Sequence, residues 1–196
     1  MLLWINGPFG VGKTQTAFAL ARRLPGSFVC DPEQLGFGLQ RMTPPALRGD
    51  FQDVPLWREG VRRVLDRNLS HFDGVLIAPM TVVNPAYFGE IVGELRRAGH
   101  DVRHVALLAS RETLLRRLRS RAESGESWGA QQLDRCLYGL NQLDPSEHLH
   151  TDGLTHEQVV EAVAARAGLT LQPDNQTNWQ RHWNRMRVRI RSARGD

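Results

Sequence analysis

The chain has 196 residues, of which 41% are apolar and 23% are charged, a balance typical of one compact globular domain. It excludes a disordered chain, a collagen-like repeat and a disulfide-stapled miniprotein, and the two cysteines, Cys30 and Cys136, suit a reducing cytosol. No signal peptide or membrane-spanning helix is expected, and the net charge of +4 comes from 24 arginines and a single lysine, Lys13, against 21 acids.

Apolar runs and amphipathic segments alternate along the chain, which predicts strands and helices in turn. Strands are predicted near residues 2–6, 28–30, 75–78, 102–109 and 148–150. Helices are predicted in the segments 13–24, 55–69, 85–99, 111–118, 130–142 and 156–167. Near-continuous apolar strands between amphipathic helices predict an α/β fold whose parallel sheet is covered by helices on both faces.

The helix boundaries carry capping signals. Asp53 is predicted to cap the helix that starts at Pro55, and Asn84, Ser110 and Thr155 are predicted to cap later helices. Residues 31–53 contain several glycines and prolines and show no clear period. They are therefore predicted to form a long irregular stretch, of the kind that serves as a lid or a binding loop.

The motif GPFGVGKT fits the phosphate-loop pattern G-x-x-x-x-G-K-[S/T] and lies between a predicted strand and a predicted helix. Its glycines let successive N–H groups point at phosphate oxygens, its lysine places an ammonium on the β- and γ-phosphates, and its threonine can bind Mg²⁺. A chance match in a chain of this composition is about one in a thousand. The predicted nucleotide-binding residues are Gly7, Pro8, Phe9, Gly10, Val11, Gly12, Lys13 and Thr14.

The position of the acidic residues favours a small-molecule kinase over a motor or a GTPase switch. The apolar strand at 75–78 is not followed by the acid that motors and switches use for Mg²⁺. An acid follows the second predicted strand instead, and Asp31 is our candidate for the base that takes the proton of the attacking hydroxyl. An Asx-turn is the other interpretation of Asp31, and Glu33 is the second candidate base or a partner of magnesium-bound water.

Phosphoryl transfer also needs positive charge around the moving oxygens. The segment RETLLRRLRSR places Arg117 and Arg121 one helical turn apart, so both can face the same ligand. A solvated basic helix face is the alternative.

The acceptor is expected to bind between the proposed base and the next helix, and just beyond the third strand. Aromatic rings there can stack on a planar base, and polar groups can bind its edge or a sugar. Core packing is the competing interpretation for Trp57. The candidate residues are Glu33, Phe37, Phe51, Gln52, Trp57, Arg58 and Thr81.

The positive charge is concentrated at the carboxyl end. Residues 179–196 contain six arginines and one acid, and their apolar residues recur at helical spacing. This pattern favours an anionic membrane surface as a partner, docking on the domain is the alternative, and nucleic acid is the least favoured partner. Two parts are predicted, a domain over residues 1–171 and a basic amphipathic tail over 172–196.

These features together resemble the bacterial tunicamycin-resistance proteins. The resemblance rests on GPFGVGKT, on the DPE that follows the second strand, on DFQDVPLWR and on the basic carboxyl end, and it spans nearly the whole chain. This group is similar to nucleoside monophosphate kinases and chloramphenicol phosphotransferase. It implies a P-loop fold with a five-stranded parallel sheet, ATP and Mg²⁺ as cofactors, and a lid near residues 116–135.

The resemblance also implies a function. The expected activity is ATP-dependent phosphorylation of a hydroxyl of tunicamycin, a uridine-containing lipophilic antibiotic, by a cytoplasmic enzyme located at the inner face of the membrane. Two alternatives stay open: an ATP-gated protein that sequesters the drug without chemistry, and a nucleoside or nucleotide kinase.

Overall fold

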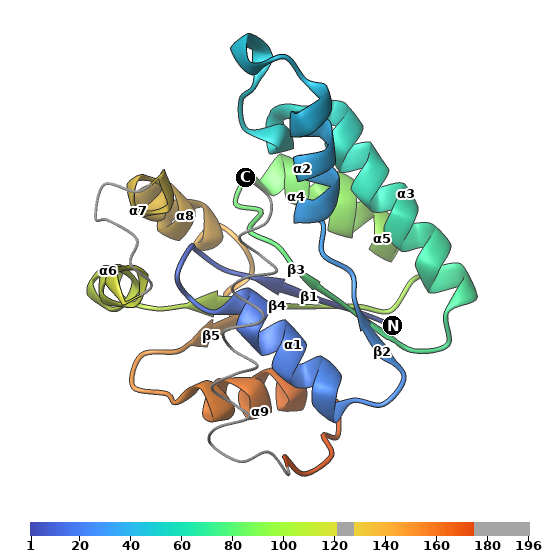
Figure 1. Ribbon diagram of the computed structural model, residues 1–196. Helices are drawn as coiled ribbons and strands as arrows, with labels where there is room; N and C mark the ends of the chain where they lie inside the picture. The colour runs from blue at the N-terminus through green and yellow to red at the C-terminus, as the bar shows by residue number, and fades with distance from the viewer. Residues whose placement is uncertain (121–127, 175–196) are drawn as a thin grey trace.

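The computed structural model describes residues 1–120 and 128–174, and only the backbone of Trp128. Within them, one parallel sheet has five strands in the order β2-β3-β1-β4-β5 (Figure 1). The strands are β1 (Leu2–Asn6), β2 (Ser27–Val29), β3 (Val75–Pro79), β4 (Val102–Leu108) and β5 (His148–His150). The predicted fold class and the predicted strands are confirmed, and the inner strands β1, β3 and β4 are almost completely buried, as apolar strands between two layers of helices should be.

Helices cover both faces of the sheet (Figure 1). On one face α1 (Lys13–Arg23) and α9 (His156–Arg166) pack on Leu3 and Ile5. On the other face α3 (Pro55–His71) packs on Leu2 and Trp4. Alternating residues of β1 therefore anchor two separate apolar clusters, as expected for a central parallel strand.

The next helical run also lies on the face of α3. It consists of α4 (Pro85–Phe88), a π-helical turn (Gly89–Gly93) and α5 (Glu94–Arg97). The Asn84 side chain accepts a hydrogen bond from the N–H of Ala86 at 2.9 Å, and Gly99 follows with φ +86°. Both boundaries were predicted from the sequence, and the π-helical turn was not.

The segment 31–53 was predicted to be irregular, and this prediction is wrong. It contains α2 (Glu33–Met42) and two 3₁₀ turns, η1 (Pro45–Leu47) and η2 (Phe51–Asp53). Gly36, which weakens the helical signal, is needed in the helix because the Phe51 ring lies 2.7 Å from where its Cβ would be.

The prediction that Asp53 caps the helix at Pro55 is also wrong. Val54 holds the capping position of α3 without a side-chain bond, and Pro55 begins the helix. The Asp53 carboxylate instead accepts a hydrogen bond from the Tyr87 hydroxyl at 3.0 Å. It therefore joins η2 to α4.

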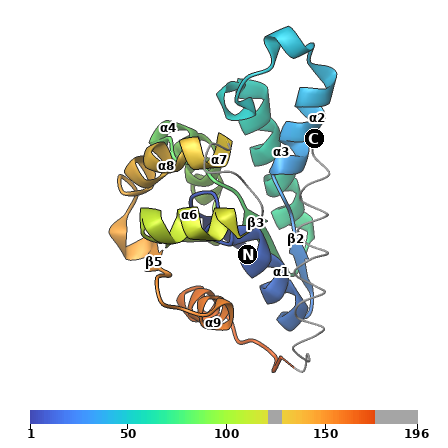
Figure 2. The same ribbon diagram turned by 60° about the vertical axis from the view of Figure 1, so that its left-hand side comes forward.

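The remaining elements lie between β4 and β5 in the chain. They are α6 (Arg111–Arg119), α7 (Trp128–Gln131), α8 (Leu133–Leu140) and η4 (Pro145–Glu147). The predicted caps Ser110 and Thr155 are present, the latter as a complete capping box with Gln158. Figure 2 shows α6, α7 and α8 on one side of the molecule, with α2 and α3 on the other. No helix in the described ranges is long and apolar enough to cross a bilayer.

The predicted boundary between domain and tail lies near the last described residues. Gln172 still pairs with α1, because its N–H donates to the Arg23 carbonyl at 2.9 Å and its carbonyl accepts from Arg23 Nε at 2.7 Å. Residues 175–196, which hold the predicted amphipathic pattern, lie outside the described residues.

Candidate active site

The phosphate loop, Gly7–Thr14, joins the carboxyl end of β1 to α1. Gly7, Gly10 and Gly12 have φ values of +147°, +82° and +107°, which L side chains rarely adopt. At Gly7 a Cβ would also lie 2.6 Å from the carbonyl oxygen of Leu107 on β4. The backbone path of the loop therefore requires glycine at the positions that the motif predicts.

Lys13 is the first residue of α1 and is only 8% exposed. Its Nζ donates to the Pro8 carbonyl at 3.2 Å and lies 5.5 Å from the centroid of the Phe9 ring. These contacts hold the ammonium over the loop. The first N–H groups of α1 have no partners within the helix, so the helix end adds positive charge at the same place. This arrangement fits the phosphates of a nucleotide.

The second residue of α1, Thr14, is half-buried at the same helix end. In the ranges 1–120 and 128–174, no three His, Cys, Asp or Glu side chains gather as a protein-only metal site. A magnesium ion prefers phosphate oxygens and waters with only one or two protein ligands. The donor set therefore fits an ion that is bound together with the nucleotide, with the Thr14 hydroxyl as its protein ligand.

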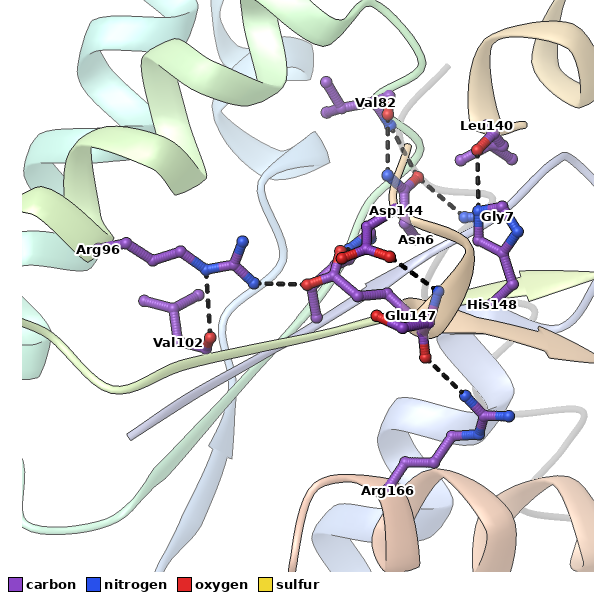
Figure 3. Close-up of polar contacts among 12 residues, drawn as sticks. Asn6, Gly7, Val82, Arg96, Val102, Leu140, Asp144, Glu147, His148 and Arg166 are labelled. Carbon is purple, nitrogen blue, oxygen red and sulfur yellow. Dashed lines mark hydrogen bonds and ion pairs between the residues drawn. The ribbon is translucent and has the colours of Figure 1, made fainter. Parts of the chain in front are cut away.

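Two side chains fix the start of the loop. Asn6 is completely buried, and its Oδ1 accepts hydrogen bonds from the N–H groups of Gly7 and Val82 at 2.9 and 3.0 Å (Figure 3). Its Nδ2 donates to the Val82 carbonyl at 2.8 Å, and the Thr81 hydroxyl donates to the Gly7 carbonyl at 2.8 Å. The loop after β3 is thus bonded to Gly7 directly through Thr81 and indirectly through Asn6. Asn6 was missed in the sequence, although a polar residue at the end of an apolar strand is a signal for a buried hydrogen-bonding role.

The acidic pair lies where β2 ends and α2 begins. Asp31 Oδ1 accepts a hydrogen bond from the Glu33 N–H at 3.0 Å, so the Asx-turn interpretation of Asp31 describes its local structure. Burial raises the pKa of Glu33, the negative charge of Asp31 raises it further, and the charge of Lys13 opposes the shift. Glu33 is therefore within electrostatic reach of both Asp31 and Lys13 at the carboxyl edge of the sheet.

Arg117 of α6 contacts the phosphate loop. Its Nη1 donates to the Val11 carbonyl at 3.4 Å and to the Thr151 hydroxyl at 3.1 Å, and its Nη2 donates to the Thr151 carbonyl at 3.0 Å. The guanidinium thus connects the loop to the segment after β5. Its predicted partner Arg121 lies outside the described residues.

A second arginine, Arg135, contacts the region predicted to bind the acceptor. Arg135 Nη2 on α8 lies 3.2 Å from Asp50 Oδ2, and Asp50 Oδ1 accepts from the Gln52 N–H at 3.0 Å at the start of η2. Burial raises the pKa of the neighbouring Cys136 thiol, while the charges of Lys13 and Arg135 oppose the shift. The Arg135–Asp50 pair therefore joins α8 to the segment that follows α2, near the phosphate loop.

The candidate acceptor residues fall into two groups. Four are buried: Gln52, Trp57, Arg58 and Thr81. Trp57 has no exposed surface and donates from Nε1 to the Pro32 carbonyl at 3.2 Å, so it packs in the core. Arg58 Nε lies 2.6 Å from Glu90 Oε2, and its guanidinium stacks 4.0 Å over Tyr87. Trp57 and Arg58 therefore hold the start of α3 in place.

The other acceptor candidates, Glu33, Phe37 and Phe51, are half-buried. The Phe37 and Phe51 rings meet edge to face with centroids 6.2 Å apart. The Phe51 ring also contacts Trp57, with centroids 5.2 Å apart, and it lies against Gly36. Of the aromatic side chains predicted to meet an acceptor, Phe37 and Phe51 are therefore the two with accessible surface.

Comparisons with known proteins agree with this arrangement. The family model described as AAA domain matches residues 2–143. The solved tunicamycin resistance protein of Deinococcus radiodurans is similar at 37% identity and a TM-score of 0.74, and the match covers 88% of this chain and 98% of that one. No curated protein matched in the corresponding search.

More distant structures share the fold. A sugar kinase of Janibacter sp. HTCC2649 has 18% identity and a TM-score of 0.62, with 86% of this chain and 95% of that chain covered. A gluconokinase of Sinorhizobium meliloti 1021 has 17% identity and a TM-score of 0.60, with 85% and 90% covered. The fold is thus that of small-molecule kinases, and the chain belongs to the P-loop kinase-like AAA domain family, together with the tunicamycin resistance protein of Deinococcus radiodurans.

Proposed function

We propose that the chain is an ATP-dependent phosphotransferase that phosphorylates a hydroxyl of tunicamycin or of a closely related uridine-containing compound. One observation carries the proposed chemistry: the phosphate loop follows β1 and the acidic pair Asp31 and Glu33 follows β2, so both lie at the carboxyl edge of the same parallel sheet. An acid that can take a proton and a cation that binds phosphate therefore share this edge, as transfer to a hydroxyl requires. The similarity to a tunicamycin resistance protein supports the choice of acceptor.

The residues have distinct proposed roles. Lys13 and the N–H groups of Gly7–Thr14 bind and orient the β- and γ-phosphates. Asp31 takes the proton of the acceptor hydroxyl, and Glu33, whose pKa is raised by burial and by the charge of Asp31, is the second candidate for this base. Mg²⁺, with Thr14 as its protein ligand, supplies positive charge that neutralises the phosphate oxygens.

Arginines are proposed to surround the transferred group. Arg117 supports the phosphate loop from the side of α6, and Arg121 follows one turn later in the sequence. Arg135 is proposed to leave Asp50 for the acceptor when the site is filled, because its side chain is 56% exposed. Phe37 and Phe51 are the proposed contacts for the base of the acceptor.

The carboxyl-terminal residues 172–196 are proposed to form a basic tail that binds an anionic membrane surface from the cytoplasmic side, while residues 1–171 form the kinase domain. The six arginines in residues 179–196 support this partner. Replacing three of them with serine in the full chain should reduce co-flotation with anionic vesicles, and unchanged flotation would remove the tail from this role.

The acceptor is tested by acceptor-dependent release of ADP. Purified full-length protein is incubated with ATP, Mg²⁺ and each member of a panel that contains tunicamycin, uridine, nucleoside monophosphates and gluconate. The proposal expects the largest stimulation with tunicamycin and little with the other compounds. Stimulation by a nucleoside monophosphate would assign a nucleotide kinase, and nucleotide-dependent binding of tunicamycin without ADP release would assign a protein that sequesters the drug.

A further inference from the structure

The segment between α2 and η2 projects from the rest of the molecule. Figures 1 and 2 both show the turn after α2 extending past the start of α3, away from the sheet. We call residues 41–48, with the sequence RMTPPALR, the α2 tip. It contains the last residues of α2 and the turn η1.

The α2 tip exposes two large apolar side chains. Met42 is 84% exposed and Leu47 is 75% exposed, the two highest values among the exposed large apolar residues of the described chain. Neither belongs to the two apolar clusters that flank the sheet. Between them, Pro44, Pro45 and Ala46 are also exposed. A projecting apolar turn of this kind marks a contact surface.

Hydrogen bonds within the segment fix the shape of the tip. The Thr43 hydroxyl donates to the Leu39 carbonyl at 2.8 Å, and Arg48 Nε donates to the Thr43 carbonyl at 2.9 Å. The Gln40 side chain closes the base of the turn by donating to the Gly49 carbonyl at 2.7 Å. Because these bonds fix the backbone of the turn, little further backbone entropy is lost when its apolar side chains meet a partner.

The charge of the α2 tip points to the kind of partner. Arg41 and Arg48 flank the apolar residues, both are exposed, and the segment contains no acidic residue. Apolar side chains between arginines suit an anionic membrane surface, where the apolar groups enter the acyl boundary and the guanidinium groups bind lipid phosphates.

We infer that the α2 tip is a docking surface for an anionic lipid bilayer. A protein partner of ordinary affinity needs roughly 800 Å² of surface on each side, which a turn of this size does not offer by itself. The basic residues 179–196 are a poor occupant, because they carry six arginines and would meet Arg41 and Arg48 with the same charge. An anionic surface attracts both segments.

The α2 tip and the candidate base Glu33 lie at opposite ends of the same helix. The ten residues of α2 span roughly 15 Å, with Glu33 at one end and Met42 at the other. A bilayer bound at the tip would therefore lie close to the acceptor side of the active site. This consequence rests on the proposed function, whereas the docking surface does not.

The inference is tested with a fluorophore at the tip of the full chain. Met42→Cys is labelled with an environment-sensitive dye, and Tyr138→Cys on α8, at a side chain that is 73% exposed, serves as the control. The native Cys30 and Cys136 are replaced by serine in both proteins, so that the dye attaches only at the chosen position. The vesicles contain phosphatidylcholine alone or mixed equally with phosphatidylglycerol.

With the mixed vesicles, the dye at position 42 should shift to shorter wavelength and be quenched by spin-labelled lipid, while the dye at position 138 should not. Arg41→Ser/Arg48→Ser should weaken the response at position 42 about tenfold or more. No response at position 42, with or without binding of the protein to vesicles, would overturn the inference. A blue-shifted dye without vesicles that Trp179→Ser/Trp183→Ser reverses would show that the tail covers the tip instead.

Discussion

Arg117 is bonded to Thr151 through both terminal nitrogens of its guanidinium, at 3.1 and 3.0 Å, and one of these nitrogens also reaches the Val11 carbonyl. Residues that are 34 positions apart thus meet beside the phosphate loop. Gly10 of the loop fits closely under the same helix, since its Cβ would lie 3.0 Å from Leu118 Cγ. The position of α6 on the loop is therefore set by one guanidinium and one glycine.

Arg117→Lys should weaken nucleotide binding about tenfold or more, because lysine keeps the charge and loses the planar fork that reaches Thr151 and Val11 together. Titration with a fluorescent ATP analogue measures the effect. Arg116→Lys is the matched control, since Arg116 is exposed and donates to Thr113 of its own helix rather than to the loop in the described part of the chain. Equal affinities for the two variants would argue against a role of Arg117 at the loop.

Gly7→Ala should destabilise the protein by about 2–4 kcal/mol, because φ at Gly7 is +147° and the new Cβ would collide with the Leu107 carbonyl. Denaturant unfolding measures this loss. Gly38→Ala, in the interior of α2 with no atom within 4 Å of its Cβ position, should instead be neutral or stabilise by up to ~1 kcal/mol. A Gly7→Ala protein as stable as the wild type would contradict the loop geometry.

Thr81→Val should raise the dissociation constant for ATP about fivefold, because the isosteric side chain cannot donate to the Gly7 carbonyl. Thr81→Ser keeps the hydroxyl and should bind ATP like the wild type. If the valine variant lost only thermal stability and kept its ATP affinity, Thr81 would support the fold without positioning the loop.

Glu33→Gln should change stability in a pH-dependent way. Since the folded pKa of Glu33 is raised, its contribution to stability is fully present below the unfolded pKa and is lost as the pH rises through the folded pKa. Glutamine does not titrate, so Tm of the variant should rise relative to the wild type as the pH is raised from about 4, near the ordinary pKa of Glu, towards neutrality. A Tm difference that is constant across this range would mean that Glu33 has no raised pKa.

The inner strands of the sheet could be predicted from the sequence because they are short apolar runs, as in Leu2–Asn6 and Val75–Pro79. The phosphate loop was equally clear, since it combines a fixed motif with a strand before it and a helix after it. In both cases the signal is local.

The acceptor side was harder to predict because its structure depends on distant contacts. The glycines of α2 suggest a loop, and the contact of Gly36 with the Phe51 ring explains why a glycine stands inside the helix. The partner of Arg135, Asp50, is 85 residues away, and nothing in the sequence indicates that the two side chains meet. Periodicity likewise could not show that Arg58 is buried, because its partner Glu90 lies on another helical run.

The central claim is that a phosphoryl group moves from ATP to the drug, and the mass of tunicamycin after incubation with the protein, ATP and Mg²⁺ tests it most directly. The account predicts a gain of one phosphate with the wild type and none with Lys13→Ala or Asp31→Asn. Tunicamycin of unchanged mass, bound only when ATP is present, would contradict it.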